Sequence, residues 1–143
     1  MCLGARPHLA ALDEQTWESF SAVWNTDVQA TFHVCQAALR SPLPPGSTVV
    51  ILSSGAAIGG SPLSGGYAGA KRMQWFLGGY AQRVSNTRAL DLRFVTLVPR
   101  QLVVGTEIGE AASMAYAAEG GISQEKYMER FGAPLLPEAV AGV

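Results

Sequence analysis

Apolar residues recur every three or four positions in the first third of the chain. They are Trp17, Phe20, Val23, Trp24, Val28, Phe32, Cys35, Ala38 and Leu39. This is the period of an α-helix with one buried face, so it predicts one long or slightly bent helix that ends near Arg40. Asp13 is a suitable helix cap and Glu14 suits the first turn, so we expect the helix to begin there. Prolines and a glycine in residues 41–46 end it.

Two short apolar runs predict β-strands. Residues 48–52 read Thr-Val-Val-Ile-Leu and residues 92–98 read Leu-Arg-Phe-Val-Thr-Leu-Val. The first run does not alternate with polar residues, so we expect a strand buried on both faces, as in a parallel sheet covered by helices. A loop rich in glycine, serine and proline follows at residues 53–66, and then a helical segment from about Tyr67 to Val84. A strand, a crossover helix and a strand form a right-handed parallel unit.

The last third of the chain predicts two short helices, at about 107–118 and 123–131. The tail, residues 137–143, resembles the first turn of a helix that is cut short. The whole pattern indicates one α/β domain spanning residues 1–143, with a doubly wound parallel sheet. Two parallel strands expose both edges and much of both faces. We therefore expect an incomplete domain, which either borrows strands from a partner or belongs to something longer.

Composition narrows the class of protein. The chain has 143 residues, of which 48% are hydrophobic and 15% charged, as in ordered globular domains. The chain contains ten Lys plus Arg residues and eleven Asp plus Glu residues, so its charge is nearly balanced. This balance gives no reason to expect a nucleic acid or an acidic membrane as a partner. No apolar run reaches the roughly 20 residues of a membrane span, and residues 1–8 have too little apolar length for a signal peptide. We expect a cytoplasmic protein without a membrane partner.

The cysteines and histidines do not predict a metal site. Cys2 and Cys35 follow no metal or redox spacing, and His8 and His33 have no Cys or carboxylate at ligand spacing. We expect Cys35 to be a buried free thiol on a helix face. His33 lies on the same apolar stretch, where we expect a packed, hydrogen-bonded side chain.

Three residues combine into a possible reaction site. Ser54 follows the first strand, Tyr67 begins the next helix and Lys71 lies four residues further on. Positions i and i+4 share one face of a helix, so the Lys71 ammonium can lie near the Tyr67 hydroxyl and lower its pKa from about 10. Such a phenol can give a proton to a developing alkoxide or remove one from an alcohol. Ser54 can hydrogen-bond the same substrate oxygen, because ligands of open α/β sheets bind where the strands end.

The pair Ser53-Ser54 and the run Tyr67-Ala-Gly-Ala-Lys71 resemble the active-site signature of the short-chain dehydrogenases/reductases. The resemblance extends from about Leu12 to the end of the chain. It implies a partial Rossmann-like sheet and an oxidoreductase that interconverts a small-molecule carbonyl and an alcohol. It also implies that Tyr67 is the general acid/base, that Ser54 orients the substrate and that Lys71 holds the nicotinamide ribose. Pro99 and Thr106 would lie beside a cofactor that is either NAD or NADP, although Thr106 suits equally well the role of cap for the helix that follows it.

The chain departs from this signature in three places. The family usually has an asparagine on the long first helix, which completes a proton relay through water. That position falls on Asp27, while Asn25 lies two residues earlier and points in another direction. Arg100 follows Pro99 where the family usually has glycine, and it either contacts an anionic group or is a solvated loop residue. No glycine-rich turn follows an N-terminal strand, so the pyrophosphate cradle is absent from the sequence and we expect no turnover from this chain alone.

Other functions compete with the oxidoreductase. In this family two long helices commonly pair with those of a second subunit, so a non-catalytic, self-associating module is the main alternative, and we expect a homo-oligomer. Large apolar residues on both helices suit either a core or such an interface. A serine hydrolase is less well supported, because Ser54 lacks a Gly-x-Ser-x-Gly elbow. A phosphate-binding P-loop is excluded by the spacing of Gly66 and Lys71.

Overall fold

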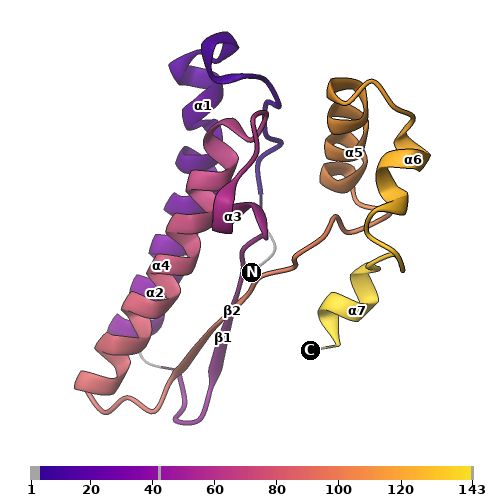
Figure 1. Ribbon diagram of the computed structural model, residues 1–143. Helices are drawn as coiled ribbons and strands as arrows, with labels where there is room; N and C mark the ends of the chain where they lie inside the picture. Colours follow the sequence, from indigo (N-terminus) through magenta and orange to yellow (C-terminus); the bar gives the residue numbers. More distant parts are fainter. Residues whose placement is uncertain (1–3, 42, 143) are drawn as a thin grey trace.

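The computed structural model describes residues 4–41 and 43–142, so Cys2 lies outside the described residues. Long helices lie along the strands, and three shorter helices follow the second strand (Figure 1). In chain order the elements are η1 (Leu12–Glu14), α1 (Trp17–Val23), η2 (Trp24–Val28), α2 (Gln29–Arg40), β1 (Thr48–Leu52), α3 (Ala56–Gly59), α4 (Gly65–Thr87), β2 (Arg93–Leu97), α5 (Glu107–Glu119), α6 (Gln124–Glu129) and α7 (Pro137–Ala141).

The predicted first helix is present, with a different start and an unexpected middle. It ends at Arg40 as predicted, but it begins at Trp17, because Thr16 accepts a hydrogen bond from the Ser19 amide and caps it. Asp13 lies instead in the short 3₁₀ turn η1, so its predicted capping role is wrong. Between α1 and α2 the helix widens into the π-helical turn η2. Such turns change which residues face a neighbouring helix and are frequent at functional sites.

The two strands pair in parallel, as the sequence predicted. Thr48 is aligned with Arg93 and Leu52 with Leu97, and α4 makes the connection between them. The predicted α/β fold with a partial Rossmann-like sheet is confirmed. The loop predicted at residues 53–66 contains more helix than expected, because residues 56–59 form the helical turn α3 and α4 already begins at Gly65.

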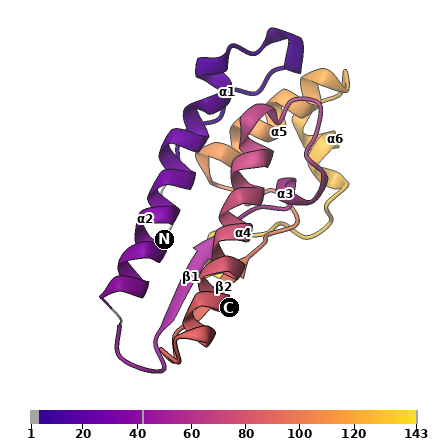
Figure 2. The ribbon, with the colours of Figure 1, turned by 90° about the vertical axis from the view of Figure 1, so that its left-hand side faces the viewer.

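One face of the sheet carries the apolar core. Side chains from α2, α4 and both strands meet there, namely Cys35, Ala38, Ile51, Ala81, Leu92 and Phe94. Cys35 is buried as predicted. The expected burial of β1 on both faces is wrong, because Val50 is 41% exposed. Figure 2 shows α2 and α4 side by side along the strands. Since both helices pack against one face, alternate residues of β1 face away from the core.

Gly78 sets how closely α4 approaches the sheet. A Cβ atom at Gly78 would clash with the Thr96 hydroxyl of β2, whereas one at Gly79 would meet only the end of the Arg83 side chain at 3.8 Å. Gly78 is buried and Gly79 is exposed. Gly78 is therefore required for the close packing of α4 on the sheet, whereas Gly79 is exposed and not required for it.

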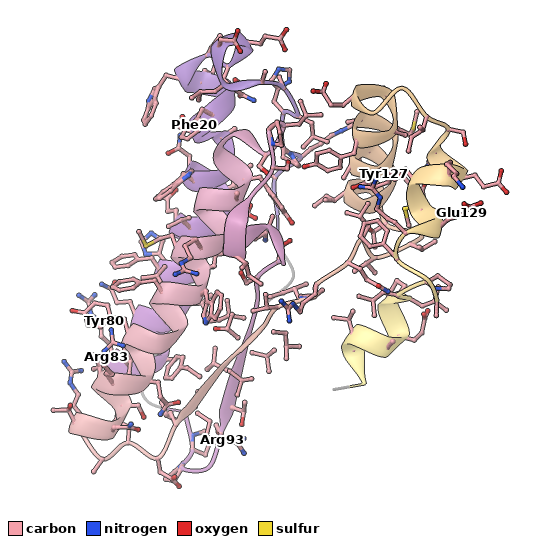
Figure 3. All side chains as sticks on the ribbon, in the orientation of Figure 1. Phe20, Tyr80, Arg83, Arg93, Tyr127 and Glu129 are labelled. Atoms are coloured by element: carbon pink, nitrogen blue, oxygen red, sulfur yellow. The ribbon has the colours of Figure 1, made fainter. Side chains whose placement is uncertain are left out.

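The outer surface of the long helices is unusually apolar. Figure 3 shows Tyr80 and Arg83 projecting from α4 away from the strands. Trp17, Phe32, Phe76 and other large side chains on these helices are also exposed. His33 is exposed as well and contacts only the edge of the Phe32 ring among described aromatic pairs, so the prediction of a packed histidine is wrong.

Helices α5 and α6 form a separate pair beyond the end of β2. Tyr127 points from α6 toward α5 (Figure 3), where its ring stacks on Tyr116 at a centroid distance of 5.8 Å. Val104 donates a backbone hydrogen bond to Leu135 at 2.9 Å, which ties the segment after α6 to the loop after β2. This pair lies across from the loop that follows β1 (Figure 1).

Candidate active site

The end of β1 is held firmly against α4. The Ser53 amide donates to the Leu97 carbonyl at 2.8 Å, and the Ser53 hydroxyl donates to the Lys71 carbonyl at 2.7 Å. Ser54 comes next, and its Oγ accepts a hydrogen bond from the Ala56 amide at 3.2 Å. Tyr67 lies in the first turn of α4, with Lys71 one turn further on. Ser53 thus fixes the strand end relative to the helix that carries the other two groups.

Ser54 and Tyr67 both line one cavity of about 500 Å³. Its walls come from the loops after β1 and β2 and from α5 and α6. Apolar and aromatic side chains dominate this lining, and Arg100, Arg130 and Glu119 supply its charges. A volume of this size is typical of small-molecule sites, which combine apolar walls with a few converging polar groups. Two of the three predicted catalytic residues therefore reach the same solvent-accessible space.

Lys71 lies beside Tyr67 but outside the cavity lining. Its Nζ is 5.5 Å from the centre of the Tyr67 ring. The ammonium is buried and makes an ion pair with Asp27 of η2, with 3.1 Å between Lys71 Nζ and Asp27 Oδ2. The prediction that Lys71 and Tyr67 share one face of the helix is confirmed, but the charge of Lys71 is already paired.

The pKa of Tyr67 is raised above its ordinary value, contrary to the expectation from the sequence. Burial is the largest cause, because it disfavours the charged phenolate, and the negative charge of Asp27 also raises the pKa of Tyr67. A hydrogen bond with the Ser54 side chain acts in the opposite direction and lowers it. The tyrosine is therefore a neutral phenol at neutral pH.

Asp27 occupies the position where the resemblance placed an asparagine. It is 1% exposed. Its Oδ1 accepts from the Ala5 amide at 2.8 Å, and its backbone carbonyl accepts from Thr31 Oγ1 at 2.8 Å and from Gln74 Nε2 at 3.3 Å. Asn25 lies on the exposed side of η2, where its amide contacts Ser21 Oγ at 3.5 Å. Of the two candidates, Asp27 is the residue that meets Lys71, and it does so directly.

The two further residues predicted to contact the cofactor, Pro99 and Thr106, lie in different parts of the structure. Pro99 lines the cavity, and its carbonyl accepts from the Gly55 amide at 2.6 Å. A Cβ atom at Gly55 would lie 3.0 Å from the Pro99 carbonyl oxygen, so a larger residue there would push the two loops apart. Thr106 caps α5, accepting from the Gly109 amide at 3.1 Å and donating to the Val103 carbonyl at 2.8 Å. Its contact with a nicotinamide stays a prediction.

Two residues of the site were missed in the sequence. Thr31 and Gln74 are buried, and Gln74 Nε2 donates to Thr31 Oγ1 at 2.8 Å. Each was detectable in principle, because Thr31 lies four residues after Asp27 and Gln74 three residues after Lys71, which places each pair on one helix face. Nothing in the sequence alone indicated that the two faces meet.

Within residues 4–41 and 43–142, no group of three or more His, Cys, Asp or Glu side chains is arranged to hold a metal ion. Among the helices of this same part of the chain, none combines the length and apolarity that crossing a membrane requires.

The comparisons with known proteins identify the fold. No protein-family model matches the chain, and neither does any curated protein. Among solved structures, the chain is similar to a short chain dehydrogenase family protein from Francisella tularensis subsp. tularensis SCHU S4, with a TM-score of 0.71 and 16% identity. The match covers 96% of this chain and 58% of the other, so the chain spans less than two thirds of that protein's length. The described residues therefore adopt part of a short-chain dehydrogenase fold.

Proposed function

We propose that this chain carries the catalytic site of an oxidoreductase that interconverts a small-molecule carbonyl and an alcohol, with NADH or NADPH as the hydride carrier. One observation carries the proposal: Ser54 and Tyr67 line one cavity at the end of a parallel strand, with a buried lysine one helical turn from Tyr67. The similar solved structure belongs to a protein named as a short chain dehydrogenase, which supports the same reaction class.

The residues have separate roles in this proposal. Tyr67 is the proton donor to the carbonyl oxygen, since its hydroxyl lines the cavity and stays neutral at neutral pH. Ser54 donates a second hydrogen bond to the same oxygen and orients the substrate. The apolar walls provide contact surface for the carbon skeleton of the substrate. Because the cavity lining carries two arginines and one glutamate, an anionic group on the substrate is tolerated.

The residues present fit the nicotinamide end of the cofactor only in part. Gly55 and Pro99 line the cavity, and their backbones approach each other closely at its wall. The resemblance assigns the ribose to Lys71 and the carboxamide to Thr106, but neither lines the cavity, and Lys71 would have to leave its ion pair with Asp27 to reach a ribose there. When bound, the cofactor supplies the hydride. No glycine-rich pyrophosphate cradle occurs in the sequence, so binding is expected to be weak and turnover by this chain alone is not expected.

A titration of the chain with NADH and with NADPH tests the proposal, followed by cofactor fluorescence or calorimetry. We expect saturable binding of at least one of them, and about tenfold or greater weakening by Lys71→Ala. Tyr67→Phe should weaken binding much less, because it keeps the ring and removes only the hydroxyl. A folded chain that binds neither cofactor at millimolar concentration would contradict the proposal.

Self-association is a second candidate role, and the exposed apolar surface of the long helices favours it. Phe76 is 55% exposed, and Trp17, Phe32, Trp75 and Tyr80 are exposed with it. Exposed apolar surface of this extent commonly marks a contact with another protein surface. A second copy of this chain, as a homo-oligomer in the cytoplasm, is the proposed partner. A monomeric hydrodynamic radius at micromolar concentration would count against this role.

A further inference from the structure

A buried polar cluster lies between η2, the first turn of α2 and the first half of α4. It consists of Asp27, Thr31, Lys71 and Gln74, and all four side chains are buried. Asp27 and Lys71 are its only charged members, so their opposite charges balance. Burial of a charge away from water is costly unless it is paired and hydrogen-bonded. The ion pair of 3.1 Å and the Ala5 amide on the second carboxylate oxygen meet this requirement.

The carboxylate is fixed more rigidly than the ammonium. Asp27 is held by its Oδ1 contact with Ala5 and by two hydrogen bonds to its backbone carbonyl, from Thr31 and Gln74. Lys71 has a flexible four-carbon side chain, and Asp27 is the acceptor that the structure gives its ammonium. Asp27 therefore decides where the ammonium lies.

We propose that Asp27 is a positioning residue, which holds the Lys71 ammonium in a buried ion pair and so withholds its positive charge from the neighbouring Tyr67 oxygen. The proposal rests on the proposed function for its catalytic consequence but not for its electrostatics. In the reduction, the carbonyl carbon gains the hydride of the dihydronicotinamide, the carbonyl oxygen gains the Tyr67 proton, and Tyr67 is left as phenolate. Asp27 makes that phenolate less stable, so Tyr67 is a weaker acid, and its phenolate a stronger base, than a tyrosine beside an unpaired lysine.

Charged and titratable groups face Tyr67 from each neighbouring element. Asp27 lies on η2, Tyr116 on α5, Ser54 in the loop after β1, and Lys71 on the same helix as Tyr67. Asp27 and Tyr116 both raise the pKa of Tyr67 through their negative charges, and the Ser54 hydroxyl lowers it. Asp27 is the one carboxylate among these groups, so its removal is expected to lower the pKa of Tyr67, whereas removal of the Ser54 hydroxyl is expected to raise it.

The titration of Tyr67 tests the proposal without any need for activity. Phenolate absorbance is followed against pH, and the Tyr67 signal is the difference between a protein and the same protein with Tyr67→Phe. We expect Asp27→Asn to lower the titration midpoint of Tyr67 by about one pH unit or more, because it removes a like charge and frees Lys71 to face the phenolate. Asparagine keeps an oxygen for the Ala5 amide, so the substitution conserves the shape of the cluster.

Asp13→Asn is the matched control, since it makes the same chemical change in η1 and should leave the midpoint in place. A folded Asp27→Asn protein with an unchanged or higher Tyr67 midpoint would overturn the proposal. If Asp27→Asn does not fold, the pair Lys71→Met and Asp27→Asn/Lys71→Met answers the same question. The proposal requires the double variant to titrate at lower pH than Lys71→Met, and equal midpoints would overturn it.

A cofactor titration separates this proposal from the proposed function. NADH and NADPH are each added to the wild-type protein and to the folded Asp27→Asn protein, and the Tyr67 midpoint is measured for both. A midpoint shift in proteins that bind neither cofactor at millimolar concentration would contradict the proposed function and leave the electrostatic role of Asp27 standing. Cofactor binding without any shift in the Tyr67 midpoint would do the reverse.

Discussion

The two ends of the α2–α4 helix pair differ sharply in what they bury. At one end, Cys35 and Ala38 of α2 pack with Ala81 of α4 against apolar side chains of the sheet. At the other end, beside the cavity, the same pair of helices buries an ion pair and two neutral polar side chains. The apolar end is stabilised by the burial of apolar surface away from water, which does not depend on specific pairs of partners. The polar end is stable only when each partner is present.

This difference shows which end of the helix interface carries the polar groups that are costly to bury. A helix pair packed by apolar residues along its whole length would need no ion pair. Instead, the chain places its only described buried ion pair one helical turn from Tyr67, the residue proposed to move a proton. The costly end of the interface is the end next to the cavity, as expected when polar groups are kept for function.

Removal of one charge from the polar end should have the largest effect on stability. Lys71→Met leaves Asp27 as an unpaired buried carboxylate, and we expect a loss of about 3–5 kcal/mol in the free energy of unfolding. Asp27→Asn/Lys71→Met removes both charges and should recover part of this loss. Urea unfolding followed by circular dichroism measures both. If the double variant were less stable than Lys71→Met, the two ends would not differ in the way described.

At the apolar end, the adjacent glycines of α4 give a smaller and more local test. Gly78→Ala puts a methyl group against the Thr96 hydroxyl and should cost about 1–3 kcal/mol through overpacking. Gly79→Ala meets only the end of the Arg83 side chain, at an ordinary contact distance, and should stabilise the helix by about 0.5–1 kcal/mol. The two urea midpoints should therefore move in opposite directions. A shift in the same direction would mean that the approach of α4 to the sheet is not tight.

The smallest expected effect is the dependence of stability on alkaline pH. The folded-state pKa of Tyr67 is raised, chiefly by burial, so its contribution to stability is complete below its unfolded pKa of about 10 and is lost as pH rises through the folded value. Tyr67→Phe should reduce the loss of unfolding free energy between about pH 9 and pH 11. Tyr127→Phe is a useful comparison, because the pKa of Tyr127 is also raised by burial. If neither substitution reduces the loss of unfolding free energy that the wild-type protein shows over this pH range, this account is contradicted.

Local patterns were sufficient for most of the elements. The β-branched run predicted β1 with its observed bounds, and the three-and-four period predicted the end of the first helix at Arg40. The start of that helix was wrong, because Asp13 and Thr16 are both acceptable caps and only the path of the chain through Gln15 selects Thr16. The burial of β1 on both faces was wrong for a similar reason, since a local run does not reveal how many helix layers cover it.

The sequence by itself determined the two parallel strands, the helix between them and the order of serine, tyrosine and lysine, because all of these follow from local periods and spacings. Only the tertiary structure decided that Asp27 meets Lys71, that Ser53 fastens the strand end to α4 and that the pKa of Tyr67 is raised. Asp27 and Lys71 are separated by 44 positions. Charges so distant in sequence interact only when two helix faces are packed together, and burial acts on a tyrosine only after the chain has folded around it.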